Sequence, residues 1–569
     1  MGDVLTYLVD GTSGLAPGGV DGKAIIAGVC SKGQVGKAYL IGKRTNLNSL
    51  LGIGPLVDRL RHMIATAGQE PVIVAVPVAS RQSSYISDVK VSGSKIAPNV
   101  SGIAAKNADI VVKVATQGEL DSATLEVSTD GGKTFKSPVS ASEQVVIGYG
   151  DDATGVTLVF PEDASLEAGA RFSCVARTSV GPVEIIGDQA SPKIEVDAGQ
   201  NGVLAGGELV IQIVKSGKLN DGTFQYSVDG GDSFERVRTI PVDGSFAIAD
   251  LGVSLEFAQG TYIAGTTYKC EILAPTASIT DVMEALESPL ATHDVEFVHI
   301  AAPTDSVDWA AAQAKAEELW NIHRPTYFKL ETRLPYADED INDFTNWLLR
   351  EKQELAARFV TVCPQYGEIV NSLGKSHLAN AASLQAGRVM SIPVQRATGR
   401  VKDGPVSQLS LPENWDAVQA TLEDAGFLTA KKYAGLDGVY WGDSRTLADA
   451  TSDFRYEEVL RTVFKAVRLL RIAALKSLYD ETGDPVRAVT GLGLTYLKAS
   501  LGNALDTMVK ANPQELAGYV IDIAPNQDIA NNGVAVDITL IGIGIIRQIK
   551  LYPRYVYAGS SFDPRLQDA

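Results

Sequence analysis

The beginning of the chain alternates short apolar runs with a helical pattern. Residues 24–29 and 72–76 are apolar runs, and apolar residues recur at helical spacing through residues 57–67. Continuous apolar runs of this length are typical of strands that are buried on both faces of a parallel sheet. The pattern therefore predicts a β-α-β unit.

From about residue 88 the pattern changes to short alternating segments separated by Gly, Ser, Asp and Pro, and helical periodicity returns only at residue 279. Within this stretch residues 125–135 (LEVSTDGGKTF) recur as residues 224–234 (FQYSVDGGDSF), and the patterns beside them recur as well. Such alternation around Asp-Gly-Gly turns is typical of β-hairpins. We expect two tandem β-sandwich modules of about 90 residues each.

After residue 279 strand and helix patterns alternate again. The expected strands are residues 297–301, 327–330 and 359–363, and the expected helices are residues 309–320 and 341–357. Asp305 or Ser306, and Asp338 or Asp340, are candidate N-caps, because such side chains accept hydrogen bonds from the first helical turn. The predicted fold class is α/β (α+β), with one discontinuous domain and a parallel sheet that the two β modules interrupt.

The last third begins with a loop-rich region, residues 391–436. A long amphipathic helix is expected over residues 453–479, followed by a half-buried strand at residues 534–540 and an extended segment at residues 548–557. On the helix, one face is apolar and another face carries three bases, Arg461, Lys465 and Arg468.

The net charge of the chain excludes some classes of binding partner. The 569 residues include 50 Lys and Arg against 68 Asp and Glu, for a net charge of −18. Nucleic acid and anionic membrane surfaces would repel this charge, so neither is expected as a main partner. No apolar stretch reaches the roughly 20 residues of a membrane helix, and no secretory signal is visible. The four cysteines form no CxxC pair, which favours reduced thiols and a cytoplasmic folding compartment.

Candidate chemistry is sparse. Residues 28–34 resemble a phosphate-binding loop, but Gln34 stands where the lysine is needed. The acidic residues 338–340 are better explained as a helix cap than as a metal site. His293 and His299 are spaced too widely for one rigid metal site, and no cysteine lies near them. We expect no catalytic, cofactor-binding or metal-binding residue, no cofactor and no enzymatic activity.

The repeated Ser-x-Asp-Gly-Gly-x-Ser/Thr-Phe segments resemble the Asp-box of sialidases and other carbohydrate-active β proteins. In those proteins the motif is a hairpin turn remote from catalysis. We therefore expect Asp130 and Asp229 to cap their own turns, with Phe135 and Phe234 packed beneath. A carbohydrate-binding or adhesive β-sandwich surface protein remains the alternative function.

Two further regions resemble the tail sheath proteins of contractile phage tails and related injection systems. The first is residues 26–41 (IAGVCSKGQVGKAYLI) followed by residues 50–54 (LLGIG) and 71–76 (PVIVAV). The second is residues 437–447 (DGVYWGDSRTL) running into residues 452–461 (SDFRYEEVLR). Gln34 replaces the usual proline, and Asp443-Ser444 replaces the usual Gly-Ala. The resemblance covers residues 1–87 and 279–569.

The resemblance implies a structural subunit that stacks as rings around an inner tube and contracts to drive the tube through the target cell envelope. The implied partners are further copies in a helical stack, the inner tail tube protein, and baseplate and tail terminator proteins. Direct nucleic-acid contact and membrane insertion are not implied. The implied location is the tail of a bacteriophage virion, assembled in the bacterial host cytoplasm and used for genome ejection and host cell entry.

The expected domains follow from this resemblance together with the β insertion. They are an N-terminal arm and linker (1–22), a first sheath-core segment of α/β type (23–91), a first inserted β-sandwich module (92–190), a second inserted β-sandwich module (191–277), a second α/β sheath-core segment (278–430), a C-terminal sheath domain (431–547) and a C-terminal arm (548–569).

In the sheath family, extended arms add strands to sheets of neighbouring subunits. The residues that match in this chain are Val4, Leu5, Tyr7 and Val9 at the N-terminus, and Ile549, Leu551, Tyr552, Tyr555, Val556 and Tyr557 at the C-terminus. The basic helix face formed by Arg461, Lys465 and Arg468 is a candidate contact with an acidic inner tube.

Overall fold

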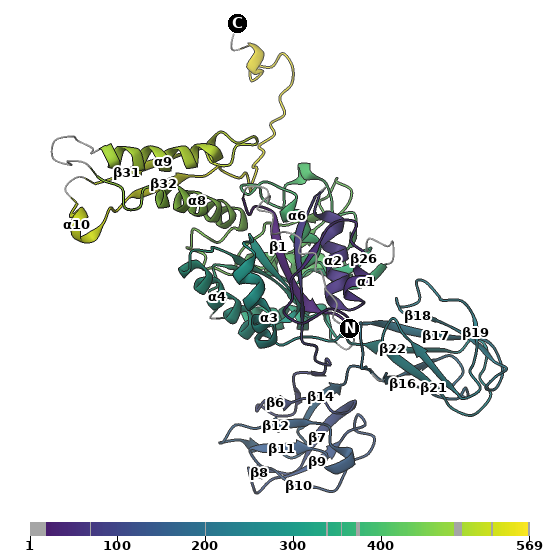
Figure 1. Ribbon diagram of the computed structural model, residues 1–569. Helices are drawn as coiled ribbons and strands as arrows, with labels where there is room; N and C mark the ends of the chain where they lie inside the picture. The colour runs from purple at the N-terminus through teal and green to yellow at the C-terminus, as the bar shows by residue number, and fades with distance from the viewer. Residues whose placement is uncertain are drawn as a thin grey trace, which may run out of the picture. The chain divides into compact units, whose positions relative to one another are not determined.

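The computed structural model describes residues 19–68, 70–199, 201–336, 339–353, 355–370, 376–482, 492–524 and 527–566. The chain divides into two compact units, Met1–Arg468 and Leu469–Ala569, called here the first and second unit. Their helices and strands are labelled in Figure 1. The fold combines α-helices and β-sheets, and the elements from residue 85 to residue 272 are almost all strands.

A six-stranded sheet forms the centre of the first unit, in the order β2-β3-β1-β23-β24-β25. Its strands are β1 (Lys23–Val29), β2 (Tyr39–Ile41), β3 (Val72–Val78), β23 (Phe297–Thr304), β24 (Tyr327–Thr332) and β25 (Val360–Cys363). All neighbours are parallel except β2, which runs antiparallel to β3. Because β1 pairs with both β3 and β23, the sheet joins segments on either side of the β insertion, and the predicted parallel sheet is confirmed.

Helices pack on this sheet because its strands are almost entirely apolar and buried. They are α1 (Leu47–Leu51), α2 (Pro55–Thr66), α3 (Ile279–Thr292), α4 (Ser306–Asn321), α5 (Ile341–Lys352), α6 (Ala382–Met390) and α7 (Trp415–Asp424). Asp305 and Asp340 are the N-caps of α4 and α5, as two of the four candidates predicted. Asp338 lies outside the described residues.

The inserted region contains two groups of strands, each around its own apolar cluster. In the first group, β4 (Tyr85–Ile86), β5 (Lys90–Ser92), β7 (Ala108–Thr116), β9 (Thr124–Ser128), β10 (Val139–Ser140) and β14 (Arg171–Arg177) share one sheet. A second sheet contains β6 (Asn99–Gly102), β11 (Gln144–Ile147) and β12 (Val156–Val159), and β8 (Gly118–Glu119) pairs with β13 (Ser165–Leu166).

The second group repeats this plan. One sheet contains β15 (Glu184–Ile186), β17 (Gly207–Lys215), β18 (Thr223–Ser227), β19 (Arg238–Thr239) and β22 (Thr267–Ile272), and the other contains β16 (Ile194–Ala198), β20 (Ser245–Ile248) and β21 (Val253–Phe257). The chain leaves and rejoins the core at adjacent points, since Arg81 and Thr276 exchange backbone hydrogen bonds of 2.8 and 2.9 Å.

The two Asp-Gly-Gly turns are closed by their aspartates. Asp130 accepts from the backbone N–H groups of Lys133 and Thr134 and from the Thr134 hydroxyl. Those hydrogen bonds, first of all the one from the hydroxyl, hold the pKa of Asp130 well below its usual range. In the second turn Asp229 accepts from the backbone N–H and the hydroxyl of Ser233. The rings of Phe135 and Phe234 lie against the turn glycines Gly132 and Gly231, as predicted, although Phe234 is still 39% exposed.

Short strands complete the first unit: β26 (Tyr366–Val370), β27 (Ser376–Asn380) and β28 (Leu409–Ser410) form one sheet, and β29 (Ala430–Lys431) pairs with β30 (Tyr440–Trp441). The long helix α8 (Glu457–Leu475) begins in this unit and ends in the second one. It starts later and stops earlier than the predicted helix over residues 453–479.

The second unit contains α9 (Leu492–Val509), β31 (Gly518–Asp522), α10 (Ile529–Asn532) and β32 (Asp537–Ile541). β31 and β32 form a two-stranded antiparallel sheet, so the predicted strand over residues 534–540 is present but begins later. Residues 542–557 follow without forming a strand in the structure. Across the described ranges, no helix is long and apolar enough to cross a membrane.

Candidate inter-subunit interface

The C-terminal ribbon, residues 546–557, is extended and highly exposed. Leu551 is 82% and Tyr555 is 81% exposed, and Ile546, Ile549, Tyr552 and Tyr557 are similarly open. None of the described strands pairs with it, and Figure 1 shows it running away from β31 and β32. Burial of one large apolar side chain contributes about 1.5–3 kcal/mol. A contiguous row of exposed apolar side chains is typical of surfaces that a partner covers.

The β31–β32 hairpin presents one packed face and one open face. Tyr519 and Ile521 lie on the face toward α9, where the Tyr519 hydroxyl donates to the Gly502 carbonyl and to Asp506. On the open face Val520 is 56% exposed, and Ile541 is exposed as well. Among the described strands neither edge of the hairpin has a further partner. Two strands alone are marginally stable, and an open edge is a template for another strand.

The N-terminal residues Val4, Leu5, Tyr7 and Val9 lie outside the described residues. The point where this arm joins the core is described, and it is held by charged side chains. Asp21 forms an ion pair of 2.5 Å with Lys465, and the Gly22 N–H donates to Glu296. The root of the arm is thus fixed to the core and to α8.

The basic face that was predicted on α8 does not exist as an exposed surface. Arg461 is 1% exposed and forms a 2.5 Å ion pair with Glu296. Burial opposes the charge of this guanidinium, yet the Glu296 carboxylate raises its pKa above the ordinary value. Arg468 donates to the carbonyls of Val295 and Pro325. The tube-contact interpretation of Arg461, Lys465 and Arg468 is therefore corrected: these bases attach α8 to the core.

A second buried charge, Glu457, holds the first turn of α8. It accepts hydrogen bonds from Lys329 at 2.5 Å, from the Tyr327 hydroxyl at 2.8 Å and from the hydroxyl of Ser444. Burial alone would raise the pKa of Glu457, but the charge and hydrogen bonds of Lys329 and the Ser444 hydroxyl lower it to about 2. The two halves of the motif at residues 437–461 meet in this contact.

Two segments of the N-terminal motif, residues 28–34 and 50–54, are also hydrogen-bonded to each other. The Ser31 and Lys32 N–H groups donate to the carbonyls of Ile53 and Leu51, at 2.8 and 3.0 Å. The loop at residues 28–34 thus uses these donors to bind the segment at residues 50–54. This pairing gives the glycine-rich loop a structural role and agrees with the rejection of the phosphate-loop interpretation.

Sequence reasoning found the ribbon and β32 but missed β31. The segment Gly518–Asp522 has the sequence GYVID, whose β-branched and aromatic residues are typical of a strand. Its length of five residues, with a helix before it and loops after it, gave too little alternation to single it out.

Comparison with known proteins places the chain in a family. A model of the DUF2586 N-terminal domain matches residues 1–445, and a model of the DUF2586 C-terminal domain matches residues 453–560. The chain belongs to the DUF2586 family. The N-terminal model includes both inserted β regions, and the C-terminal model includes α8, the hairpin and the ribbon. A search of curated proteins finds no match.

Three solved structures show similarity to this DUF2586 chain. A sheath tail protein of Desulfitobacterium hafniense is 11% identical, with 95% of this chain and 100% of that chain covered and a TM-score of 0.40. A sheath tail protein of Listeria innocua is 9% identical, with 92% and 96% covered and a TM-score of 0.38. The helical sheath of the anti-feeding prophage in its contracted state is 17% identical, with 52% and 79% covered and a TM-score of 0.36.

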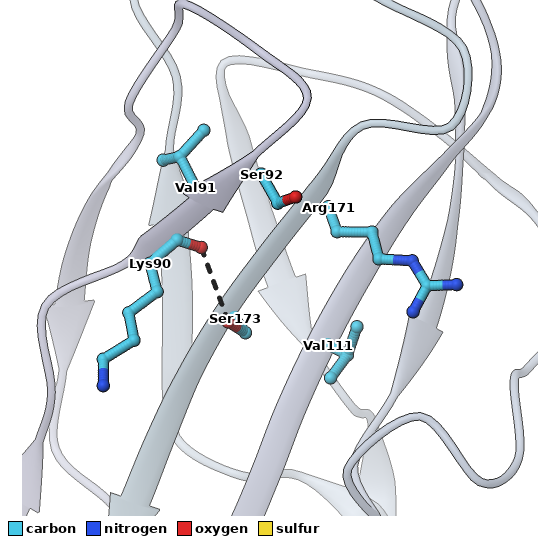
Figure 2. Close-up of a pocket in the computed structure, with 6 residues that line it drawn as sticks. All are labelled: Lys90, Val91, Ser92, Val111, Arg171 and Ser173. Atoms are coloured by element: carbon cyan, nitrogen blue, oxygen red, sulfur yellow. Dashed lines mark hydrogen bonds between the residues drawn. The ribbon is translucent and has the colours of Figure 1, made fainter.

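The DUF2586 chain also has a cavity of about 210 Å³ in its first inserted β region, lined by Lys90, Val91, Ser92, Val111, Arg171 and Ser173. Figure 2 shows that the side chains of Lys90 and Arg171 extend to opposite sides and do not converge on one point. The cavity therefore does not favour the carbohydrate-binding alternative. The described residues contain no group of three or more His, Cys, Asp or Glu side chains that could hold a metal.

Proposed function

We propose that this chain is the structural subunit of a contractile tail sheath, and that its C-terminal ribbon adds a strand to the β31–β32 hairpin of a neighbouring copy. The observation that carries the proposal is the coexistence, in one chain, of an exposed apolar ribbon and a two-stranded sheet with open edges. Each supplies what the other lacks, because strand addition pairs main-chain groups and buries alternate side chains.

Contacts of this kind lead to a polymer. The ribbon of one copy and the hairpin of the next are different surfaces, so the contact is heterologous, and a linked pair of copies still has one free ribbon and one free hairpin. Repetition then builds rings and helical stacks around an inner tube. The N-terminal arm, with Val4, Leu5, Tyr7 and Val9, is the second linker in this proposal.

Contraction is proposed as a rearrangement of rigid cores that remain linked by their arms. The extended sheath is a kinetically trapped assembly, and re-packing of the α/β cores releases it and drives the tube through the cell envelope. Such a movement needs arms that transmit force to their cores. The buried anchors of α8 and the ion pair between Asp21 and Lys465 support this role.

The two inserted regions are proposed to be β-sandwich modules that decorate the outside of the sheath. Each has two principal sheets around its own apolar cluster, and the reciprocal hydrogen bonds of Arg81 and Thr276 bring the ends of the insertion together. The inner tube protein, the baseplate and the tail terminator are the proposed partners. The proposed location is a virion tail assembled in the host cytoplasm.

Deletion of residues 549–569 tests the proposal. The truncated chain should remain a folded, soluble monomer, because the deleted ribbon contributes little to the chain's own core, whereas the full chain should form tubes. Negative-stain electron microscopy and sedimentation distinguish the two outcomes. Long tubes formed by the truncated chain would contradict strand addition by the ribbon.

A further inference from the structure

The hairpin contains two carboxylates that face each other without a cation. Asp522 on β31 and Asp537 on β32 are direct cross-strand partners, and both are exposed. In the described part of the chain neither forms an ion pair. Like charges directly opposite each other destabilise a sheet. The isolated chain therefore carries an electrostatic cost at one end of the hairpin, on its open face.

The ribbon contains bases with no acids among them. Arg547, Lys550 and Arg554 are its three charged residues. Lys550 and Arg554 are exposed, and neither has an ion-pair partner in the ranges that the structure describes. The ribbon and the acidic hairpin are thus complementary in charge.

Alternation places two of these bases, Lys550 and Arg554, on one face of the ribbon and Arg547 on the other. In an extended strand successive side chains point to opposite sides. Ile549, Leu551, Tyr555 and Tyr557 then share one face, and Lys550, Tyr552, Arg554 and Val556 share the other. Pro553 has no N–H group to donate, which suits an outermost strand.

The hairpin has matching faces. Its apolar face toward α9 would continue into the apolar face of an added ribbon, and its open face would continue into the face with Lys550 and Arg554. Because Asp522 and Asp537 lie on that open face, the bases and the acids come to the same side of the extended sheet. A slip by one residue would move the bases to the apolar side.

We propose that the Asp522–Asp537 pair restricts the register of strand addition to registers that place the even-numbered side chains of the ribbon on the open face, by binding Lys550 or Arg554 of the ribbon of a second copy. This inference rests on the proposed function and adds to it the residues that decide which strand is accepted. The N-terminal arm carries Asp3 and Asp10 and no base before residue 11. Repulsion by Asp522 and Asp537 therefore disfavours that arm at the same position.

Charge reversal in the full chain tests the proposal. Asp522→Lys with Asp537→Lys, and separately Lys550→Glu with Arg554→Glu, should each raise the protein concentration needed for tube formation by roughly tenfold, since 1.4 kcal/mol corresponds to that factor. The chain with all four substitutions should return to within about threefold of the unsubstituted chain. The differences should shrink in 1 M salt, because screening weakens exposed ion pairs.

Matched controls separate this contact from general charge effects. Arg547→Glu changes the same charge on the opposite face of the ribbon and should not be rescued by Asp522→Lys with Asp537→Lys. Asp480→Lys with Glu481→Lys changes two exposed acids outside the hairpin and should leave assembly unchanged. Thermal unfolding of each soluble variant, matched to that of the unsubstituted chain, shows that folding is intact.

The outcomes distinguish the register contact from strand addition itself. If the unsubstituted chain forms tubes while the reversals assemble equally well, or the four substitutions together fail to rescue assembly, the register contact is wrong and strand addition stands. If the unsubstituted chain forms no tubes, the proposed function fails, and the register contact fails with it.

Discussion

The central sheet of the first unit and the hairpin of the second unit differ in two respects: whether their strand edges are paired, and whether the charged side chains near them have partners. In the central sheet β1 and β23 have neighbours on both sides, and the charges beside them are buried and paired, as Arg461 is with Glu296. In the hairpin both strands have an open edge, and Asp522 and Asp537 are exposed side by side. The first arrangement is complete within one chain, whereas the second is suited to completion by another chain.

This difference separates the residues that stabilise the single chain from those that are suited to assembly. A buried charge that loses its partner destabilises the chain that contains it, because the remaining group cannot be solvated. An exposed apolar residue that is removed changes the stability of its own chain very little. Substitutions in the two regions should therefore affect different measurements.

The largest effect on the free energy of unfolding is expected from a substitution in the core. Glu457→Ala leaves Lys329 buried without its carboxylate, and loss of one partner of a buried pair costs about 3–5 kcal/mol. Denaturant unfolding of the monomer should show this loss in the free energy of unfolding. Tyr552→Ala in the ribbon is the matched comparison and should stay within about 0.5 kcal/mol of the unsubstituted chain. Equal effects at the two sites would contradict the distinction between them.

The next largest effect is expected on the free energy of unfolding at acidic pH. The pKa of Glu457 is lowered to about 2 from an ordinary 4.5, so its ionised form stabilises the folded state at neutral pH. This contribution is lost as the pH falls from about 4.5 toward about 2, because the unfolded state takes up the proton first. It amounts to roughly 3 kcal/mol at most. Unfolding free energies measured across this range should fall less steeply for Glu457→Gln, and an identical slope would show that another group is responsible.

The smallest effect, measured as tube formation, is expected from removal of the inserted β regions. A variant that lacks residues 92–275 should still polymerise, because the proposed strand-addition contacts lie outside this region. That deletion leaves β4 and β5 without β14, so a cut from residue 83 to residue 274, closed by a short Gly-Ser linker, is the cleaner version. Arg81 and Thr276 are already hydrogen-bonded, and the linker spans a short gap. Loss of tubes with a folded core would show that the inserted regions build the lattice.

Hydrophobic patterning predicted the elements that depend on local sequence. The apolar runs predicted β1, β3 and β23–β25, and the side chains of Asp305 and Asp340 predicted two helix starts, because caps and buried strands are recognisable from neighbours along the chain. The extended segment at residues 548–557 was also predicted, from its aromatic and β-branched residues, whereas its exposure is seen only in the structure.

The candidate site was predicted only partially. Periodicity placed Arg461, Lys465 and Arg468 on one side of a helix, but it does not show what that side contacts. The carboxylate that pairs with Arg461 comes from Glu296, far away in the sequence. For the same reason the apposition of Asp522 and Asp537 was missed, since the register of β31 and β32 places them together.

The sequence by itself determined the parallel sheet, the repeated β regions and an extended C-terminal segment rich in apolar and aromatic side chains. These properties follow from short-range periodicity and from residue type. Only the tertiary structure decided that three bases of α8 attach it to the core and that an acidic pair marks the open hairpin. Pairing of charges depends on distance in space, and the fold brings together residues that the sequence keeps apart.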